Sequence, residues 1–135
     1  GVSGIGTNIY VEGFKVTSEK YRGIMVTGGA KVVLKGVDVV GCPGEGIFVF
    51  ETVTNVELVD CISNDNLTGL SAGKDAFVTL RGSFTANNNR GGGIVSTNAT
   101  VEKVYGLDLT LEGNTGGNEI QLEGGQILDL PEGKK

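Results

Sequence analysis

The chain has 135 residues, the size of one ordinary domain, and contains 24 glycines, 2 prolines and no histidine. Hydrophobic residues make up 39%, which suffices for a core, and the glycines show no three-residue period, so wholesale disorder and a collagen triple helix are excluded. A net charge of -5 argues against nucleic acid as a partner, and no apolar run is long enough to span a membrane as a helix. Because the chain has no histidine, Ser-His and Cys-His nucleophiles are impossible.

An internal repeat begins at residues 23–26, where the sequence reads GIMV. The pattern returns as GIFV at 46–49, GLSA at 69–72, GIVS at 93–96 and, more loosely, EIQL at 119–122. Counted on the Ile or Leu position, the copies are 23, 23, 24 and 26 residues apart. A fixed period of this length is typical of a solenoid. We therefore expect one inward stack formed by Ile24, Ile47, Leu70, Ile94 and Ile120.

Two more columns of short apolar-x-apolar segments follow each copy along the chain. The second column contains Ile9/Val11, Val32/Leu34, Val56/Leu58, Val78/Leu80, Val101 with Val104, and Leu128/Leu130. The third contains Phe14/Val16, Val37/Val39, Cys61/Ser63, Phe84/Ala86 and Leu109/Leu111. An alternation of two is the period of a β-strand. The sequence thus predicts an all-β solenoid over residues 1–130, with five to six rungs of about 23 residues, three short strands per rung and a polar tail at 131–135.

A polar column follows the third strand of each rung and consists of Glu19, Cys42, Asn66, Asn89 and Asn114. Stacked asparagines can hydrogen-bond from rung to rung. The repeat and this column resemble the right-handed parallel β-helices of the pectate-lyase-like superfamily, and the resemblance covers nearly the whole chain. The segment FTAN at 84–87, followed by GGI at 92–94, is also similar to the FxxN and GG[A/G]I repeats of bacterial surface adhesins built on this fold.

The leucine-rich repeat is the competing interpretation, because its repeats also have 20–29 residues. Residues 34–42 and 58–66 fit its LxxLxLxxN/C pattern, but the next copy has one residue too many between Leu80 and Phe84. The half that should be helical is instead rich in glycine and β-branched residues, as at 91–95. A helix in every repeat would favour this alternative.

The outward positions of the first column are expected to form an unusually apolar wall. They are Met25/Thr27, Phe48/Phe50, Ser71/Gly73, Val95/Thr97 and Gln121/Glu123. Contiguous apolar patches mark contact surfaces, so the candidate binding surface comprises Met25, Phe48, Phe50, Val95, Thr97 and, from the preceding turn, Tyr21. Two alternatives stay open, namely a bare contact surface and a wall covered by a segment of the chain itself.

The resemblance also implies where an enzyme of this family would bind a polysaccharide, along this wall and beside the preceding turn. Arg22 and Arg90 would then hold a uronate carboxylate, and Glu45 would act as acid or base. The NTD…DD…GHG…RIK motifs of the polygalacturonases are missing, and the aspartates fall in different columns. Solvated turn residues are the simpler interpretation, so we expect no catalytic residues, no metal site and no cofactor.

The two cysteines are expected to be free thiols. They lie about five residues apart on neighbouring rungs, or roughly 16 Å at 3.3 Å per residue, whereas a disulfide needs Cα atoms within about 7 Å.

The sequence as a whole favours a non-catalytic β-helical module of a larger extracellular or cell-surface protein. Such a module would serve as a spacer, an adhesin or a contact surface for a polysaccharide or a protein, without nucleic-acid binding or membrane insertion. Because the chain opens directly in a rung, we expect a module cut from a longer protein or one that stacks on a partner. Self-association through the apolar wall or the exposed ends of the solenoid is included in this hypothesis. The alternative is a small polysaccharide lyase, hydrolase or epimerase on the same scaffold.

Overall fold

A computed structural model describes residues 1–133, and this part of the chain is built from β-strands and turns without a helix. The strands are β1 (Val2–Ser3), β2 (Asn8–Glu12), β3 (Lys15–Val16), β4 (Ile24–Thr27), β5 (Lys31–Lys35), β6 (Asp38–Val40), β7 (Glu45–Phe50), β8 (Asn55–Asn64), β9 (Thr68–Gly73), β10 (Phe77–Thr85), β11 (Gly92–Thr97), β12 (Thr100–Lys103), β13 (Asp108–Thr110), β14 (Glu119–Leu122) and β15 (Gln126–Asp129). The prediction of an all-β chain is confirmed, and the leucine-rich repeat is excluded because its repeats need helical segments.

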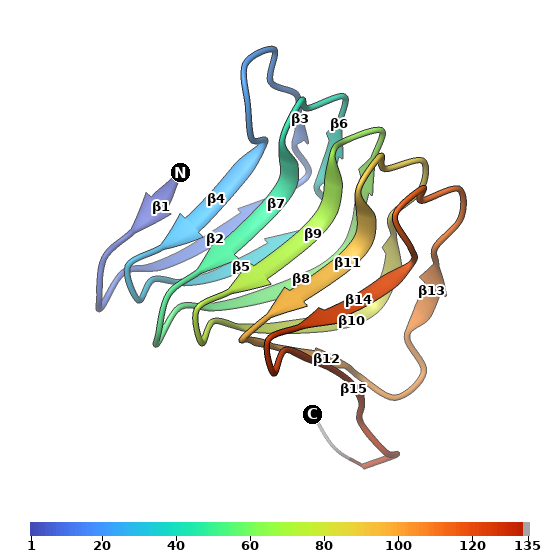
Figure 1. Ribbon diagram of the computed structural model, residues 1–135. Coiled ribbons are helices and arrows are strands. Elements are labelled where there is room, and N and C mark those ends of the chain that lie inside the picture. The colour runs from blue at the N-terminus through green and yellow to red at the C-terminus, as the bar shows by residue number, and fades with distance from the viewer. Residues whose placement is uncertain (134–135) are drawn as a thin grey trace.

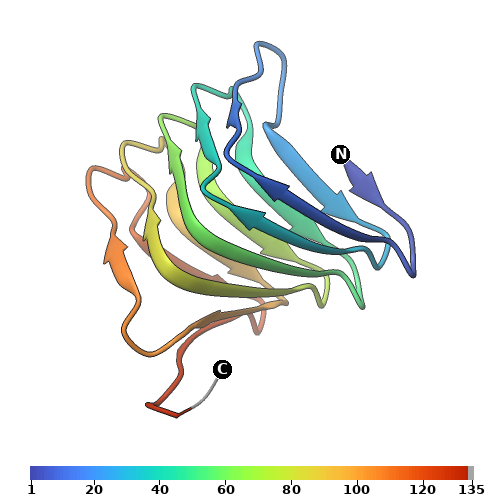
Figure 2. The ribbon, with the colours of Figure 1, turned by 180° about the vertical axis from the view of Figure 1, so that it is seen from behind.

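The strands wind into a parallel solenoid of two sheets (Figures 1 and 2). Sheet A has the order β1-β4-β7-β9-β11-β14, so each strand pairs with the strand one rung earlier and one rung later. Sheet B runs β15-β12-β10-β8-β5-β2 and also includes β3, β6 and β13. Every paired strand is parallel to its neighbour. This is the predicted β-helix, with about five turns and a spacing near 24 residues.

The core is a set of stacks in which each rung adds one side chain. Ile24, Ile47, Leu70 and Ile94 occupy equivalent positions on four successive strands of sheet A, as predicted. On sheet B, Val32, Val56, Val78 and Val101 form a second stack, and all four are buried. Side chains of the two sheets therefore meet inside the solenoid and keep successive rungs in register.

The middle rungs depart from three separate strands, because the second and third strands merge into the long strands β8 and β10. Each long strand bends at a left-handed residue, Asp60 with φ 53° and Gly82 with φ 74°. The register shifts between Arg81 and Phe84, where β10 has one more residue than β8. This β-bulge absorbs the extra residue that separates Leu80 from Phe84.

The last rung is shifted by one residue from its predicted register. Ile94 pairs with Glu119, and Val95 pairs with Ile120. A shift of one residue turns every side chain to the other face of a strand, so the prediction that Ile120 extends the inward stack is wrong. Gln121 takes an inward position instead, and the outward positions belong to Ile120 and Leu122.

The same correction applies to the end of the second column. Leu80 pairs with Lys103 and not with Val104, which the repeat places in the second column. Lys103 in turn pairs with Asp129. Val101 pairs with Ile127, so the predicted segment Leu128/Leu130 lies one residue out of register. The longer spacing lies between β11 and β14, where Gly116 and Gly117 form part of the turn before β14.

The asparagine ladder is present as predicted. The backbone N–H of Cys42 donates to Asn66 Oδ1 at 2.8 Å, that of Asn66 to Asn89 Oδ1 at 2.9 Å, and that of Asn89 to Asn114 Oδ1 at 3.0 Å. Asn66 and Asn89 are fully buried. Each side chain thus satisfies a backbone donor on the preceding rung, which a buried turn requires.

The last strand ends at Asp129, and the Leu130 N–H donates to the Lys103 carbonyl at 2.9 Å. Of the predicted tail, Lys134 and Lys135 lie outside the described residues. Within the described range there is no helix with the length and apolarity needed to cross a membrane.

Candidate functional site

The outer face of sheet A is the surface on which most of the candidate residues meet. Its outward side chains, here called the sheet A face, are Met25, Thr27, Phe48, Phe50, Ser71, Gly73, Val95, Thr97, Ile120 and Leu122. Figure 1 shows that no segment of the described chain crosses in front of these strands. The alternative of a wall covered by the chain's own segment therefore does not hold for residues 1–133.

Two phenylalanines form a ridge on this face. The rings of Phe48 and Phe50 are stacked, with centroids 5.2 Å apart and an angle of 19° between their planes. Phe50 also reaches over the neighbouring strand, since a Cβ placed on Gly73 would lie only 2.9 Å from its Cδ1. Both rings are half-buried by these contacts rather than fully exposed.

A shallow hollow of about 410 Å³ adjoins the ridge. Its lining includes the small residues Ser71 and Gly73, which follow the phenylalanines by one rung. Polar and charged side chains also line it, namely Lys74, Thr97, Asn98 and Glu123. Ridge and hollow together make the face uneven, with apolar side chains at the ridge and hydrogen-bonding groups around the hollow.

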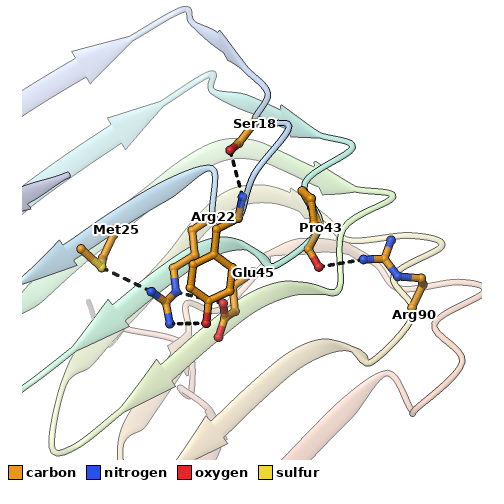
Figure 3. A network of polar contacts seen from close by, with 7 residues as sticks. Ser18, Arg22, Met25, Pro43, Glu45 and Arg90 are labelled. Atoms are coloured by element: carbon orange, nitrogen blue, oxygen red, sulfur yellow. Dashed lines mark hydrogen bonds and ion pairs between the residues drawn. The ribbon is translucent and has the colours of Figure 1, made fainter.

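Arg22 connects the ridge with the turn that precedes sheet A, and Figure 3 shows its polar contacts with Met25 and Glu45. Its guanidinium carbon lies 4.1 Å from the ring centroid of Tyr21 and 4.3 Å from that of Phe48. Nε donates to Glu45 Oε1 at 2.9 Å, and one terminal nitrogen donates to the Tyr21 hydroxyl at 3.0 Å. The Arg22 cation thus contacts both rings and is itself fixed by a carboxylate, which ties the Phe48 ring to the preceding turn.

Of the three residues that an enzyme would need, the structure joins Arg22 to Glu45, whereas the hydrogen bond of Arg90 goes to a backbone carbonyl. Arg22 and Glu45 are paired with each other. Arg90 instead donates to the Pro43 carbonyl at 2.8 Å, so it fastens two turns two rungs apart. No group of three His, Cys, Asp or Glu side chains able to hold a metal ion occurs within residues 1–133. This arrangement leaves Glu45 already engaged by a cation.

Both cysteines are free and buried, and they stay within the solenoid away from the sheet A face. The Cys61 thiol donates to the Leu34 carbonyl at 3.2 Å. Burial raises the pKa of both thiols, which makes them poor nucleophiles near neutral pH.

Four residues of the sheet A face and its hollow are not predicted from the sequence. A constant period predicts an inward Ile120 and does not place Leu122 on this face, because it does not include the shift of the last rung. Lys74 and Asn98 lie in turns directly after the outward positions Gly73 and Thr97. The spacing of 26 residues before the last copy was the one signal of the shift.

Comparison with known proteins identifies the family through the repeat itself. The model of the family described as "right handed beta helix region" matches residues 1–116. No curated protein and no solved structure gives a significant match.

Proposed function

Since the chain belongs to the right-handed β-helix family, we propose that it is a non-catalytic module that makes contacts through the sheet A face. The module would be part of a larger extracellular or cell-surface protein, and it would bind a polysaccharide or a protein surface. The observation that carries the proposal is the uncovered ridge of Phe48 and Phe50 beside a hollow with a polar rim.

Leaving such a face in water costs free energy. Single apolar side chains on a surface are ordinary, whereas contiguous apolar patches with a polar rim are typical of binding sites. Here apolar residues lie on β4, β7, β11 and β14, from Met25 to Ile120, and the intervening strand β9 contributes Ser71 and Gly73. Aromatic and arginine side chains are enriched in contact surfaces. Here Phe48 and Phe50 line one side of the hollow, and Arg22 lies over the Phe48 ring.

The geometry of the charged residues supports contact rather than catalysis. General acid–base chemistry needs a group free to take and release a proton at the reacting atom. Glu45 is bound to Arg22, while the Arg90 guanidinium donates to a backbone carbonyl. These residues hold the turns and the ridge in place.

The test is the double substitution Phe48→Ser with Phe50→Ser. Because both rings lie outside the core, the variant should keep the wild-type strand signal in circular dichroism and lose only a small part of its stability. It should lose self-association in sedimentation and retention on immobilised polysaccharides. The matched control is Tyr10→Ser, which removes an exposed aromatic ring from sheet B. Equal association and retention by the double variant and the wild type would refute the proposal.

A further inference from the structure

The ridge and the hollow lie one rung apart on adjacent strands, which makes the sheet A face complementary to itself. Phe48 pairs with Ser71 and Phe50 with Gly73, so each ring has a small residue beside it at the same level of the sheet. A symmetric dimer needs one surface that carries both the protruding and the receiving part. We propose that the partner of this face is a second copy of the chain, packed face to face about a two-fold axis parallel to the strands, between β7 and β9.

This axis follows from the positions of the side chains. Rotation about it exchanges β7 with β9, so the Phe48 ring of each copy lies over Ser71 of the other. Phe50 already covers Gly73 of its own chain, so the two Phe50 rings meet each other across the axis. The second copy then covers the hollow of about 410 Å³ at this place. The inference rests on the proposed function, because it uses the same face and names its partner.

The next strands outward also match. The axis exchanges β4 with β11, which places Met25 opposite Val95 and Thr27 opposite Thr97. These side chains are all half-buried in the single chain, and each pair is alike in polarity. The interface would thus have an apolar centre, as the fully buried parts of dimer interfaces do.

Charge at the rim supports the same axis. Glu51 directly follows Phe50, and Lys74 directly follows Gly73, so both lie in the turns at the same end of sheet A. The backbone N–H of Glu51 donates to the Gly73 carbonyl at 3.2 Å, which fixes the two turns side by side. Neither side chain forms an ion pair with another residue of the described range. Across the axis, Glu51 of each copy faces Lys74 of the other, so opposite charges meet twice.

Charge substitutions separate this arrangement from other dimers. Sedimentation of the wild-type chain should show a monomer–dimer equilibrium that shifts with concentration. Lys74→Glu places two negative charges together at both contacts, and Glu51→Lys places two positive charges there. Each variant alone should dimerise about tenfold more weakly or worse, since like charges across an interface are strongly unfavourable. Mixed in equal amounts, the two variants should form a heterodimer in which both contacts again join opposite charges.

The control for net charge is Lys31→Glu, an exposed change on sheet B that should leave dimerisation as in the wild type. The register can be tested by mixing Thr27→Cys with Thr97→Cys under oxidising conditions, which should yield a disulfide between the two variants. Failure of the mixed charge variants to associate, or cross-linking of Thr97→Cys only to itself, would overturn the proposed axis.

The two proposals fail in different ways. A wild-type chain that stays monomeric at all concentrations refutes the dimer. If that monomer is still retained on a polysaccharide, and Phe48→Ser with Phe50→Ser abolishes the retention, the contact function survives without the dimer. If neither dimerisation nor retention is observed, both proposals are refuted.

Discussion

Asn89 lies in the middle of the asparagine ladder, and its replacement by alanine tests how strongly this ladder stabilises the solenoid. Its Oδ1 accepts the Asn66 N–H at 2.9 Å, and its Nδ2 donates to the Ser63 carbonyl at 3.2 Å and to Asn114 Oδ1 at 2.9 Å. The residue is fully buried. Asn89→Ala therefore removes three hydrogen bonds from a place that water reaches poorly.

The size of the effect follows from the groups left behind. Asn114 Oδ1 still accepts the backbone N–H of residue 89, so it keeps a partner. The Asn66 N–H and the Ser63 carbonyl each lose a partner, and a buried unsatisfied group costs about 1–3 kcal/mol. We expect the free energy of unfolding to fall by about 2–4 kcal/mol, a large part of the ~5–15 kcal/mol typical of a domain.

The assay is urea unfolding followed by circular dichroism, with Asn55→Ala as the matched control. Asn55 is exposed at the start of β8, and no hydrogen bond of its side chain to another described residue is present. Its replacement should change stability by no more than about 0.5 kcal/mol. Equal losses for the two variants, or a loss below about 1 kcal/mol for Asn89→Ala, would refute the assigned role of the ladder.

Three further predictions concern single residues. Val53 is 56% exposed and has φ 70°, a conformation that a β-branched residue adopts only under strain. Val53→Gly should therefore raise the free energy of unfolding by about 1 kcal/mol, whereas Val33→Gly within β5 should lower it. Burial raises the pKa of Cys61, so the folded chain retains the thiol proton above pH ~8.5, where the unfolded thiol ionises. The free energy of unfolding should therefore fall as pH rises beyond that value, and Cys61→Ala should reduce this pH dependence when unfolding is measured from pH 7 to 10. Lys103→Met leaves Glu119 and Asp129 without their cation, so it should lower the free energy of unfolding, measured by thermal unfolding, by about 1–2 kcal/mol. Lys31→Met, at an exposed position of sheet B, should leave the stability nearly unchanged.

Much of the fold could be predicted from the sequence because a solenoid repeats its pattern along the chain. The Ile and Leu stack of sheet A and the ladder at Asn66 and Asn89 both depend on residues one rung apart. A single copy such as GIFV says little, but its return at a fixed spacing fixes the register of neighbouring rungs. The alternation of apolar residues then decides which side chains turn inward.

The candidate site was predicted less well, since it depends on how outward side chains touch one another. The sequence places Phe48 and Phe50 on one side of a strand, but it does not indicate that Arg22 stacks on Phe48 and binds Glu45. It also gives no sign that Gly73 leaves room for the Phe50 ring. Such contacts join turns and strands across rungs, where no repeat constrains the residue types.

The last rung shows why the shifted register is physically favourable. Its inward positions hold Glu119 and Gln121 on β14 and Ile127 and Asp129 on β15. Ile127 packs against the core, whereas Asp129 stacks on Lys103 of the preceding rung. Lys103 Nζ lies 2.6 Å from Glu119 Oε2 and 3.3 Å from Asp129 Oδ1, so one cation joins sheet A to sheet B.

Burial lowers the pKa of Lys103, but the hydrogen bonds and charges of Glu119 and Asp129 outweigh it and raise the pKa above its ordinary value. The stabilisation by this cation is therefore present below pH ~10.4 and is lost as pH rises through the folded pKa. Polar groups that would be costly in the middle of the stack can reach solvent at this rung, where Glu119 and Asp129 are partly or largely exposed. The apolar pattern at 119–122 predicts a further core rung with Ile120 inside, whereas the observed register places Glu119 and Gln121 inward and Ile120 and Leu122 on the sheet A face.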